Sequence, residues 1–107
     1  MTVLHTVLFQ LKPDATPEEA KTFCDYFYSL KKSCLHPKTM APYIISLKGG
    51  KDNSPESDLT HGFVLEFNTV EDRDYYVFTD PAHDAFLGSI EDMVVKFTVV
   101  DFTEGVY

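Results

Sequence analysis

The spacing of apolar side chains along the chain predicts four β-strands. Residues 2–11 alternate between apolar and polar positions, as a strand with one buried face does. Residues 60–68 repeat this alternation, and residues 94–102 form a β-branched run. The stretch 40–47 is rich in Tyr and Ile, and the glycine pair at 49–50 predicts that this strand ends there.

Local capping signals predict a helix after the first strand. Thr16 is a capping residue, Pro17 occupies the first helical position, and Glu19 supplies the reciprocal carboxylate. Apolar residues then recur at helical spacing as far as Cys34, and His36 with the following proline ends the pattern. We expect Cys24 and Cys34 on the apolar stripe of this helix, as packing residues and not as reactive thiols.

Two further helices are predicted between the third and fourth strands. Thr69 opens a short helix that runs to about residue 78, and Asp80 followed by Pro81 caps another that runs to about residue 93. The resulting order is the split βαβ arrangement of ferredoxin-like folds. We therefore predict one α+β domain over residues 1–107, with a four-stranded antiparallel sheet and helices on one face.

The second face of this sheet needs a cover, because the strands carry apolar residues on both sides while the helices shield one. In residues 2–11, for example, Leu4 and Leu8 lie on the face opposite the main apolar row. A second copy of the chain could pack sheet to sheet and close a barrel with an interior. We expect a homodimer that forms a dimeric α+β barrel.

Composition narrows the choice of partners. The chain has 9 Lys plus Arg against 17 Asp plus Glu, a net charge of −8, which argues against nucleic acid and anionic membranes. No apolar run approaches the roughly 20 residues that span a bilayer, and the N-terminus lacks the pattern of a signal peptide. We expect a cytoplasmic protein.

The histidines are the main chemical candidates. His5 and His61 each lie in an apolar strand row, where a histidine is either a hydrogen-bonded core residue or part of a ligand site. His83 takes the third position of its helix, where the helix dipole disfavours the charged ring, so it is either a general base or a surface residue. Spacing typical of metal sites is absent from the sequence, and His36 is expected to face solvent.

Four segments resemble the stress-responsive A/B barrel family, often called Dabb. They are MTVLHTVLFQLKP at 1–13, THGFVLEF at 60–67, DPAHDAF at 80–86 and VVKFTVVDF at 94–102. The resemblance covers nearly the whole chain and implies a dimeric α+β barrel.

Within that family the chain is similar to polyketide cyclases of the olivetolic acid cyclase type, which use no cofactor. The resemblance implies His83 as the general base, with His5 and His61 as pocket histidines. It also implies an apolar, substrate-binding pocket lining at Phe9, Phe23, Cys24, Phe27, Phe63, Leu65, Val77, Phe86, Leu87, Val94 and Phe97.

One position departs from the cyclase pattern. The tyrosine that partners the base there lies six residues before it, and this position is Val77 here, which has no hydroxyl. Tyr76 is the candidate catalytic tyrosine, and Tyr28 or Tyr43 could supply the hydroxyl instead.

Three functions are compatible with these features. The first is a cofactor-independent enzyme acting on a polyketide-like or aromatic carbonyl compound, by aldol cyclisation or related lyase chemistry. In it His83 removes a proton next to the carbonyl, and His5 or His61 donates a hydrogen bond to the enolate. The second is a non-catalytic stress protein that binds an apolar small molecule, and the third is a barrel that serves only as a dimer core.

Overall fold

The computed structural model describes residues 2–107 of the expected domain 1–107, and Met1 lies outside this range. The elements follow the predicted order. In sequence they are β1 (Val3–Leu11), α1 (Pro17–Ser33), β2 (Ile44–Lys51), β3 (His61–Phe67), α2 (Val70–Phe78), α3 (Pro81–Ile90) and β4 (Val94–Phe102).

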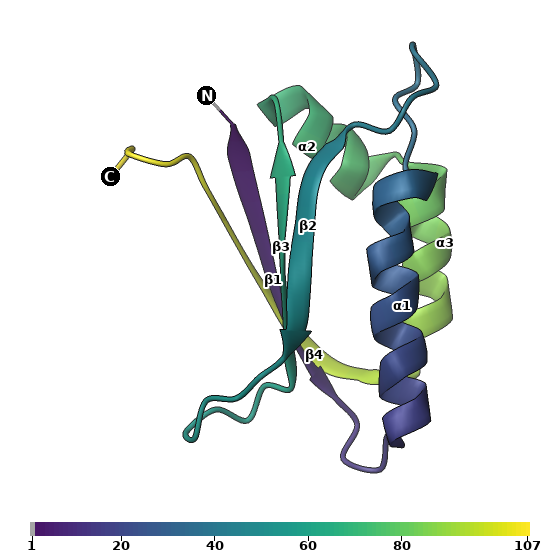
Figure 1. Cartoon of the computed structure of the whole chain (residues 1–107), viewed down its shortest axis with the longest axis vertical. Coiled ribbons are helices and arrows are strands. Elements are labelled where there is room, and N and C mark those ends of the chain that lie inside the picture. Colours follow the sequence, from purple (N-terminus) through teal and green to yellow (C-terminus); the bar gives the residue numbers. More distant parts are fainter. Residues whose placement is uncertain (1) are drawn as a thin grey trace.

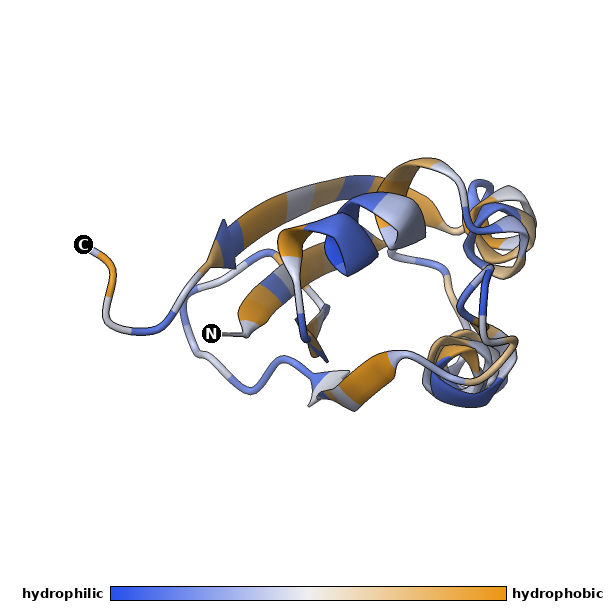
Figure 2. Ribbon diagram, turned by 90° about the horizontal axis from the view of Figure 1, so that it is seen from above, coloured by the Kyte–Doolittle hydropathy of each residue, from blue (hydrophilic) through white to orange (hydrophobic). Residues whose placement is uncertain are grey.

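The strands form one antiparallel sheet in the order β2-β3-β1-β4, with the three helices on one face (Figure 1). This confirms the ferredoxin-like α+β fold. Seen from above, α1 and α3 stand side by side at one end of the molecule, while the C-terminal segment extends away at the other (Figure 2).

Aromatic side chains fill the space between the helices and the sheet. Phe27 of α1 stacks on Phe63 of β3 with ring centroids 4.0 Å apart. Phe9 of β1 meets Phe23 edge to face at 5.2 Å. Full burial of each such side chain stabilises the fold by roughly 1.5–3 kcal/mol. The apolar stripe of α1 is therefore the main cover of the sheet.

The start of α1 follows the predicted capping box. The Thr16 hydroxyl accepts from the Glu19 amide at 3.1 Å, and the Glu19 carboxylate accepts from the Thr16 amide at 2.9 Å. The helix ends at Ser33, so Cys34 is its C-cap and not a helical residue as expected. Cys34 is nonetheless fully buried, whereas Cys24 is half-buried. Burial raises the pKa of both thiols, which agrees with packing roles.

The predicted bounds of the second strand are wrong. The strand does not run over 40–47 and stop at the glycines, because β2 begins at Ile44 and includes Gly49 and Gly50. Gly49 pairs with Phe63, whose ring lies against the glycine backbone in the space a side chain would occupy. The Tyr28 hydroxyl donates to the Gly49 carbonyl and accepts from its amide. These contacts with β3 and with α1 keep Gly49 in the strand.

Two further expectations need correction. The third helix ends at Ile90, not near residue 93, because a turn closed by the Met93 amide and the Ile90 carbonyl leads into β4. His36 is half-buried instead of facing solvent. Its Nδ1 accepts from the Lys38 amide, and its Nε2 lies 3.6 Å from Asp72 in α2.

The face of the sheet opposite the helices carries an uncovered apolar surface. Strand pairing places Leu4 and Leu8 of β1 on this face, beside Val64 of β3 and Val100 and Phe102 of β4. Val100 is 57% exposed and Phe102 47% exposed. We call this surface, made of these five side chains, the open face.

The two glycines of β2 give a matched test of this packing. We expect Gly49→Ala to lower the free energy of unfolding by about 1–3 kcal/mol, because its methyl group would overlap the Phe63 ring and the Gly62 carbonyl. Gly50→Ala is the control, since nothing lies within 4 Å of its added Cβ. Urea unfolding measures both variants. Equal stability for the two would contradict the proposed close contact.

Candidate functional site

A cavity of about 710 Å³ lies between the helices and the β1–β4 side of the sheet. Apolar side chains make most of its wall, and His83 and Tyr76 are the polar groups among the buried ones. The cavity is open along β4, where Phe97 and Val99 are largely exposed. The lining residues are Val7, Phe9, Phe27, Tyr76, Val77, His83, Phe86, Leu87, Ile90, Glu91, Val94, Val95, Lys96, Phe97 and Val99.

The start of α3 places His83 in this cavity. Asp80 is the N-cap and accepts from the Ala82 amide at 2.8 Å through Oδ1. Its other oxygen accepts from the Tyr43 hydroxyl at 2.5 Å, and the carboxyl group is almost fully buried. His83 follows at the third helical position and is buried as well. The alternative of a surface histidine is therefore wrong, because the ring is buried and stacks on Tyr76 of α2.

The ring of His83 has few polar neighbours in residues 2–107. Its Nδ1 is buried there without a hydrogen-bond partner, and the backbone of Tyr76 is the polar group that acts on the ring most strongly. Burial is the main influence on the ring and lowers its pKa; the backbone of Tyr76 acts in the opposite direction. The lowered pKa favours the uncharged ring of His83 at neutral pH, and that form can accept a proton.

Tyr76 of α2 stacks on His83, with ring centroids 4.0 Å apart and an interplanar angle of 29°. Its hydroxyl has no hydrogen-bond partner among the described side chains and backbone groups. Burial raises its pKa, so the phenol keeps its proton and remains a donor. Val77 also lines the cavity but contributes only its apolar side chain.

The structure explains why a seven-residue spacing places Tyr76 beside His83. The turn between α2 and α3 contains Thr79 and Asp80, whose amides both donate to the Tyr75 carbonyl. This tight turn brings the last part of α2 over the first turn of α3. Tyr28 and Tyr43 are not in the cavity, because their hydroxyls bind Gly49 and Asp80.

His5 lies behind Tyr76 on β1 and is not in the cavity wall. Its ring meets Tyr76 edge to face, with centroids 5.7 Å apart. Its Nδ1 lies 2.8 Å from Asp101 Oδ1 on β4, and the other Asp101 oxygen accepts from Arg73 at 2.7 Å. Burial lowers the pKa of His5, and Arg73 acts in the same direction, whereas Asp101 raises it.

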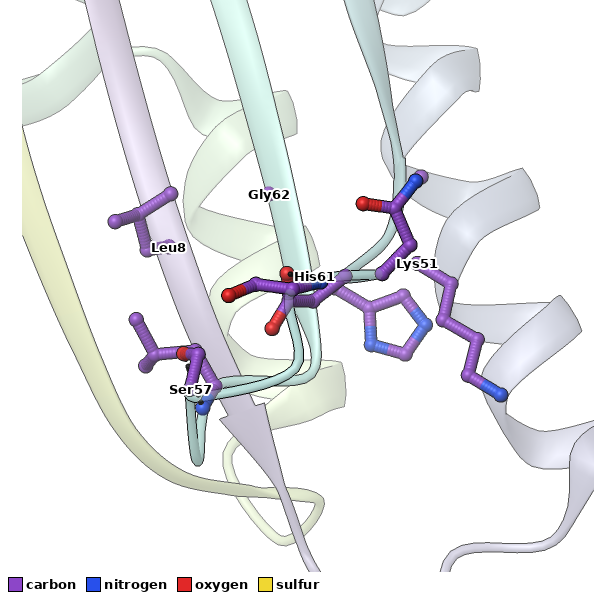
Figure 3. A pocket seen from close by; sticks show the side chains of 10 residues that line it. Leu8, Lys51, Ser57, His61 and Gly62 are labelled. Atoms are coloured by element: carbon purple, nitrogen blue, oxygen red, sulfur yellow. Dashed lines mark hydrogen bonds between the residues drawn. The ribbon is translucent and has the colours of Figure 1, made fainter.

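His61 lies in a different part of the fold from His5 and His83. It pairs with Phe9, four residues along β1 from His5, which corresponds to roughly 13 Å on a strand. Its Nδ1 lies 2.9 Å from the Thr60 hydroxyl, and burial lowers its pKa. It lines a second cavity of about 490 Å³ under the β2–β3 loop, together with Leu8, Lys51 and Ser57 (Figure 3). The histidines at 5, 61 and 83 therefore do not form one cluster.

The expected apolar lining is only partly in the cavity wall. Seven of the eleven expected residues are there, namely Phe9, Phe27, Val77, Phe86, Leu87, Val94 and Phe97. Phe23 of α1 and Phe63 and Leu65 of β3 are core residues, and Cys24 is half-buried beside that core. The position of the cavity also differs from expectation. It lies on the helix face within one chain, since its wall comes from the helices and from β1 and β4, and not between two sheets.

Sequence reasoning did not identify Asp101, Arg73 or the cavity residue Val99. Strand pairing would have been the signal for two of them, since His5 pairs with Asp101 and Val7 with Val99. That register joins residues more than 90 positions apart, and no local pattern reveals it. Arg73 is placed by α2, one turn before Tyr76 on the same side of the helix.

Residues 2–107 contain neither a metal-binding cluster nor a helix that could span a membrane. In this range no group of three or more His, Cys, Asp or Glu side chains has an arrangement that could hold a metal ion. Likewise, none of the helices described has the length and apolar character needed to cross a bilayer.

Comparisons with known proteins agree with the fold. A crystal structure of an Arabidopsis thaliana protein has a TM-score of 0.81 at 24% identity, covering 98% of this chain and 97% of that one. The hydroxynitrile lyase from Passiflora edulis has a TM-score of 0.76 at 18% identity, with 99% and 96% covered. A dimeric ferredoxin-like protein from Thermobifida fusca has a TM-score of 0.75 at 20% identity, with 96% and 91% covered.

Among curated protein sequences, none matches this chain significantly. The family model described as the stress responsive A/B barrel domain, however, matches residues 3–104. The matched range contains all seven helices and strands. The chain therefore belongs to the stress responsive A/B barrel domain family.

Proposed function

We propose that this protein is a cofactor-independent enzyme that removes a proton next to the carbonyl group of an apolar, polyketide-like or aromatic compound. The observation that carries the proposal is the environment of His83. A buried imidazole whose Nδ1 has no hydrogen-bond partner in the described chain lines an apolar cavity and stacks on a protonated tyrosine. A structural histidine in a core is normally hydrogen-bonded.

The proposed step needs a base and a hydrogen-bond donor. A ring nitrogen of His83 takes the proton, and the electron pair of the broken C–H bond becomes the enolate. The Tyr76 hydroxyl donates a hydrogen bond to the developing enolate oxygen. In an aldol cyclisation the enolate carbon then forms a C–C bond with a second carbonyl carbon. The oxygen of that carbonyl receives the proton held by His83, which returns to its uncharged form. The apolar wall excludes water, which strengthens both interactions.

Comparison with the lyase from Passiflora edulis supports the choice of an enzyme. That relative is a hydroxynitrile lyase, so a chain of this fold can house lyase chemistry. His61 has no part in the step we propose, because it lines the second cavity.

The second candidate function is a non-catalytic protein that binds an apolar small molecule. The cavity wall favours it, since apolar residues predominate and the charged side chains Glu91 and Lys96 are exposed. Binding would use the same cavity and the same two polar groups. The two functions differ in whether a bound carbonyl compound loses a proton to the protein.

We also propose that the protein is a homodimer that associates through the open face. The exposed Val100 and Phe102 side chains support this, because a contiguous apolar surface on a strand favours association. The relative from Thermobifida fusca is a dimeric protein of the same fold.

The first test uses acetophenone as a carbonyl probe and follows exchange of its methyl protons in D₂O by NMR. We expect protein-dependent exchange, and a loss of about 10²–10⁴-fold in His83→Gln, as for removal of a general base. Because burial lowers the His83 pKa below its ordinary value of 6.5, the neutral base persists to lower pH and the midpoint of the pH–rate curve should lie below pH 6.5.

His36→Gln is the matched control, since this histidine is near Asp72 and away from the cavity. Exchange that is equal in the His83→Gln and wild-type proteins would contradict the proposed base. Binding of the probe without exchange would favour the second candidate function.

A second test removes the Tyr76 hydroxyl. We expect Tyr76→Phe to reduce exchange by about 10²–10³-fold, the usual effect of losing one oxyanion donor. The free energy of unfolding should stay nearly constant, because this hydroxyl has no partner in the described chain. Tyr28→Phe is the control, as it loses a hydroxyl bound to Gly49 outside the cavity. Unchanged exchange in Tyr76→Phe would exclude the phenol as donor.

A third test concerns the dimer. We expect Val100→Asp to convert the protein to a monomer in sedimentation equilibrium, because a carboxylate on the open face would be buried without a partner. Met40→Asp is the control, as Met40 is 66% exposed in the α1–β2 connection. A Val100→Asp protein that sediments like wild type would exclude this interface.

A further inference from the structure

A chain of charged contacts leads from α2 to the rear of the site. Arg73 donates from Nη1 to Asp101 Oδ2 at 2.7 Å, and Asp101 Oδ1 lies 2.8 Å from His5 Nδ1. Arg73 also donates from Nε to Asp74 at 2.9 Å. His5 is buried, with a side-chain exposure of 8%, and Arg73 and Asp101 are half-buried, each with 21%.

We propose that Arg73 is a positioning residue of the site, which acts through Asp101 to fix the proton of His5 on Nδ1 and to keep the His5 ring uncharged. The importance of His5 for catalysis rests on the function proposed above. The arrangement of charge and proton at His5 does not, and it can be measured without a substrate.

The position of the proton follows from the chemistry of the partner. An ionised carboxylate only accepts hydrogen bonds, so the short contact to Asp101 requires a proton on His5 Nδ1. In a neutral ring Nε2 then carries a lone pair. In this form Nε2 of His5 cannot donate a hydrogen bond to an enolate. The donor role that the sequence suggested for His5 is therefore not available. The donor role passes to Tyr76.

The charge of His5 depends on Arg73. A lone carboxylate beside a buried imidazole favours the imidazolium form, as in a buried ion pair. Here the guanidinium of Arg73 engages the same carboxylate and offsets its charge, while burial disfavours the imidazolium further. The other groups that face His5 are Tyr76 of α2 and Phe67 of β3, both uncharged, and His83 of α3. The lowered pKa of His5 agrees with this balance.

The consequence reaches His83 through a row of three rings. His5 lies 5.7 Å from Tyr76 and Tyr76 lies 4.0 Å from His83, measured between centroids. A positive charge on His5 would disfavour a second proton on His83, and so weaken the proposed base. By keeping His5 neutral, Arg73 preserves the ability of His83 to accept a proton. Arg73 is also the single arginine of the chain.

The test is NMR titration of the histidine rings in ¹⁵N-labelled full-length protein, without ligand. In Arg73→Met we expect the His5 midpoint to move up by about one pH unit, because Asp101 loses its counter-charge. The His83 midpoint should move down. Arg73→Lys keeps the charge and should leave His5 near its wild-type midpoint. Asp101→Asn should move His5 down, because the carboxylate that favours the imidazolium is lost.

Two controls distinguish these shifts of the His5 and His83 midpoints from the effect of a loosened fold. Lys96→Met removes one positive charge from an exposed pair with Asp58 and should not move His5. The His61 midpoint should stay constant in every variant, since that ring lies against Phe23 of α1, away from Arg73 and Asp101. In the wild type the ¹⁵N shifts should assign the proton to Nδ1 of His5.

A wild-type His5 protonated on Nε2 alone, or an unchanged His5 midpoint in Arg73→Met, would overturn the proposal. So would a shift of His61 equal to that of His5, which would indicate general loosening. If these shifts occur but acetophenone exchange is absent, the role of Arg73 stands and the enzymatic function fails. If acetophenone exchange depends on His83 but the His5 midpoint does not shift, the enzymatic function stands and the role of Arg73 fails.

Discussion

The buried carboxylate of Asp80 connects the parts of the molecule on which the site depends. One oxygen caps the helix that carries His83, and the other accepts from Tyr43, which lies just before β2. Cys34, at the end of α1, lies close enough to Asp80 for the carboxylate to raise the pKa of its thiol. A buried charge with both oxygens in use holds its neighbours in one arrangement, since any displacement would leave an acceptor unpaired. The place of His83 is thus fixed from outside the cavity.

Two histidines with similar burial have different surroundings. His5 is tied through Nδ1 to Asp101 and Arg73, so its proton has one place. His83 has no carboxylate partner of this kind in the part of the chain described, and its Nδ1 is buried without a hydrogen bond. Tyr76 separates them and contacts both rings. The two histidines therefore differ in whether a carboxylate holds Nδ1: Asp101 holds it in His5, and no carboxylate of the described chain holds it in His83.

Much of the fold was predictable because its signals are local. The capping residues Thr16, Thr69 and Asp80 mark the starts of the helices, and alternation in β1 and β3 defines their buried faces. The features that were missed depend on distant residues. The end of β2 depends on Phe63 across the sheet, and the place of Tyr76 depends on the turn before α3. The contact between His5 and Asp101 needs the β1–β4 register, which no short window contains.

Strand β4 presents successive residues to opposite sides. Phe97 and Val99 line the cavity, whereas Val100 belongs to the open face. Because side chains alternate along a strand, a one-residue insertion within β4 would exchange these two sets. The cavity wall would then become an outer surface, and an outer surface would become the cavity wall. Evolution can therefore change the side chains of this strand one at a time, but its length between Val94 and Asp101 is constrained by both surfaces together.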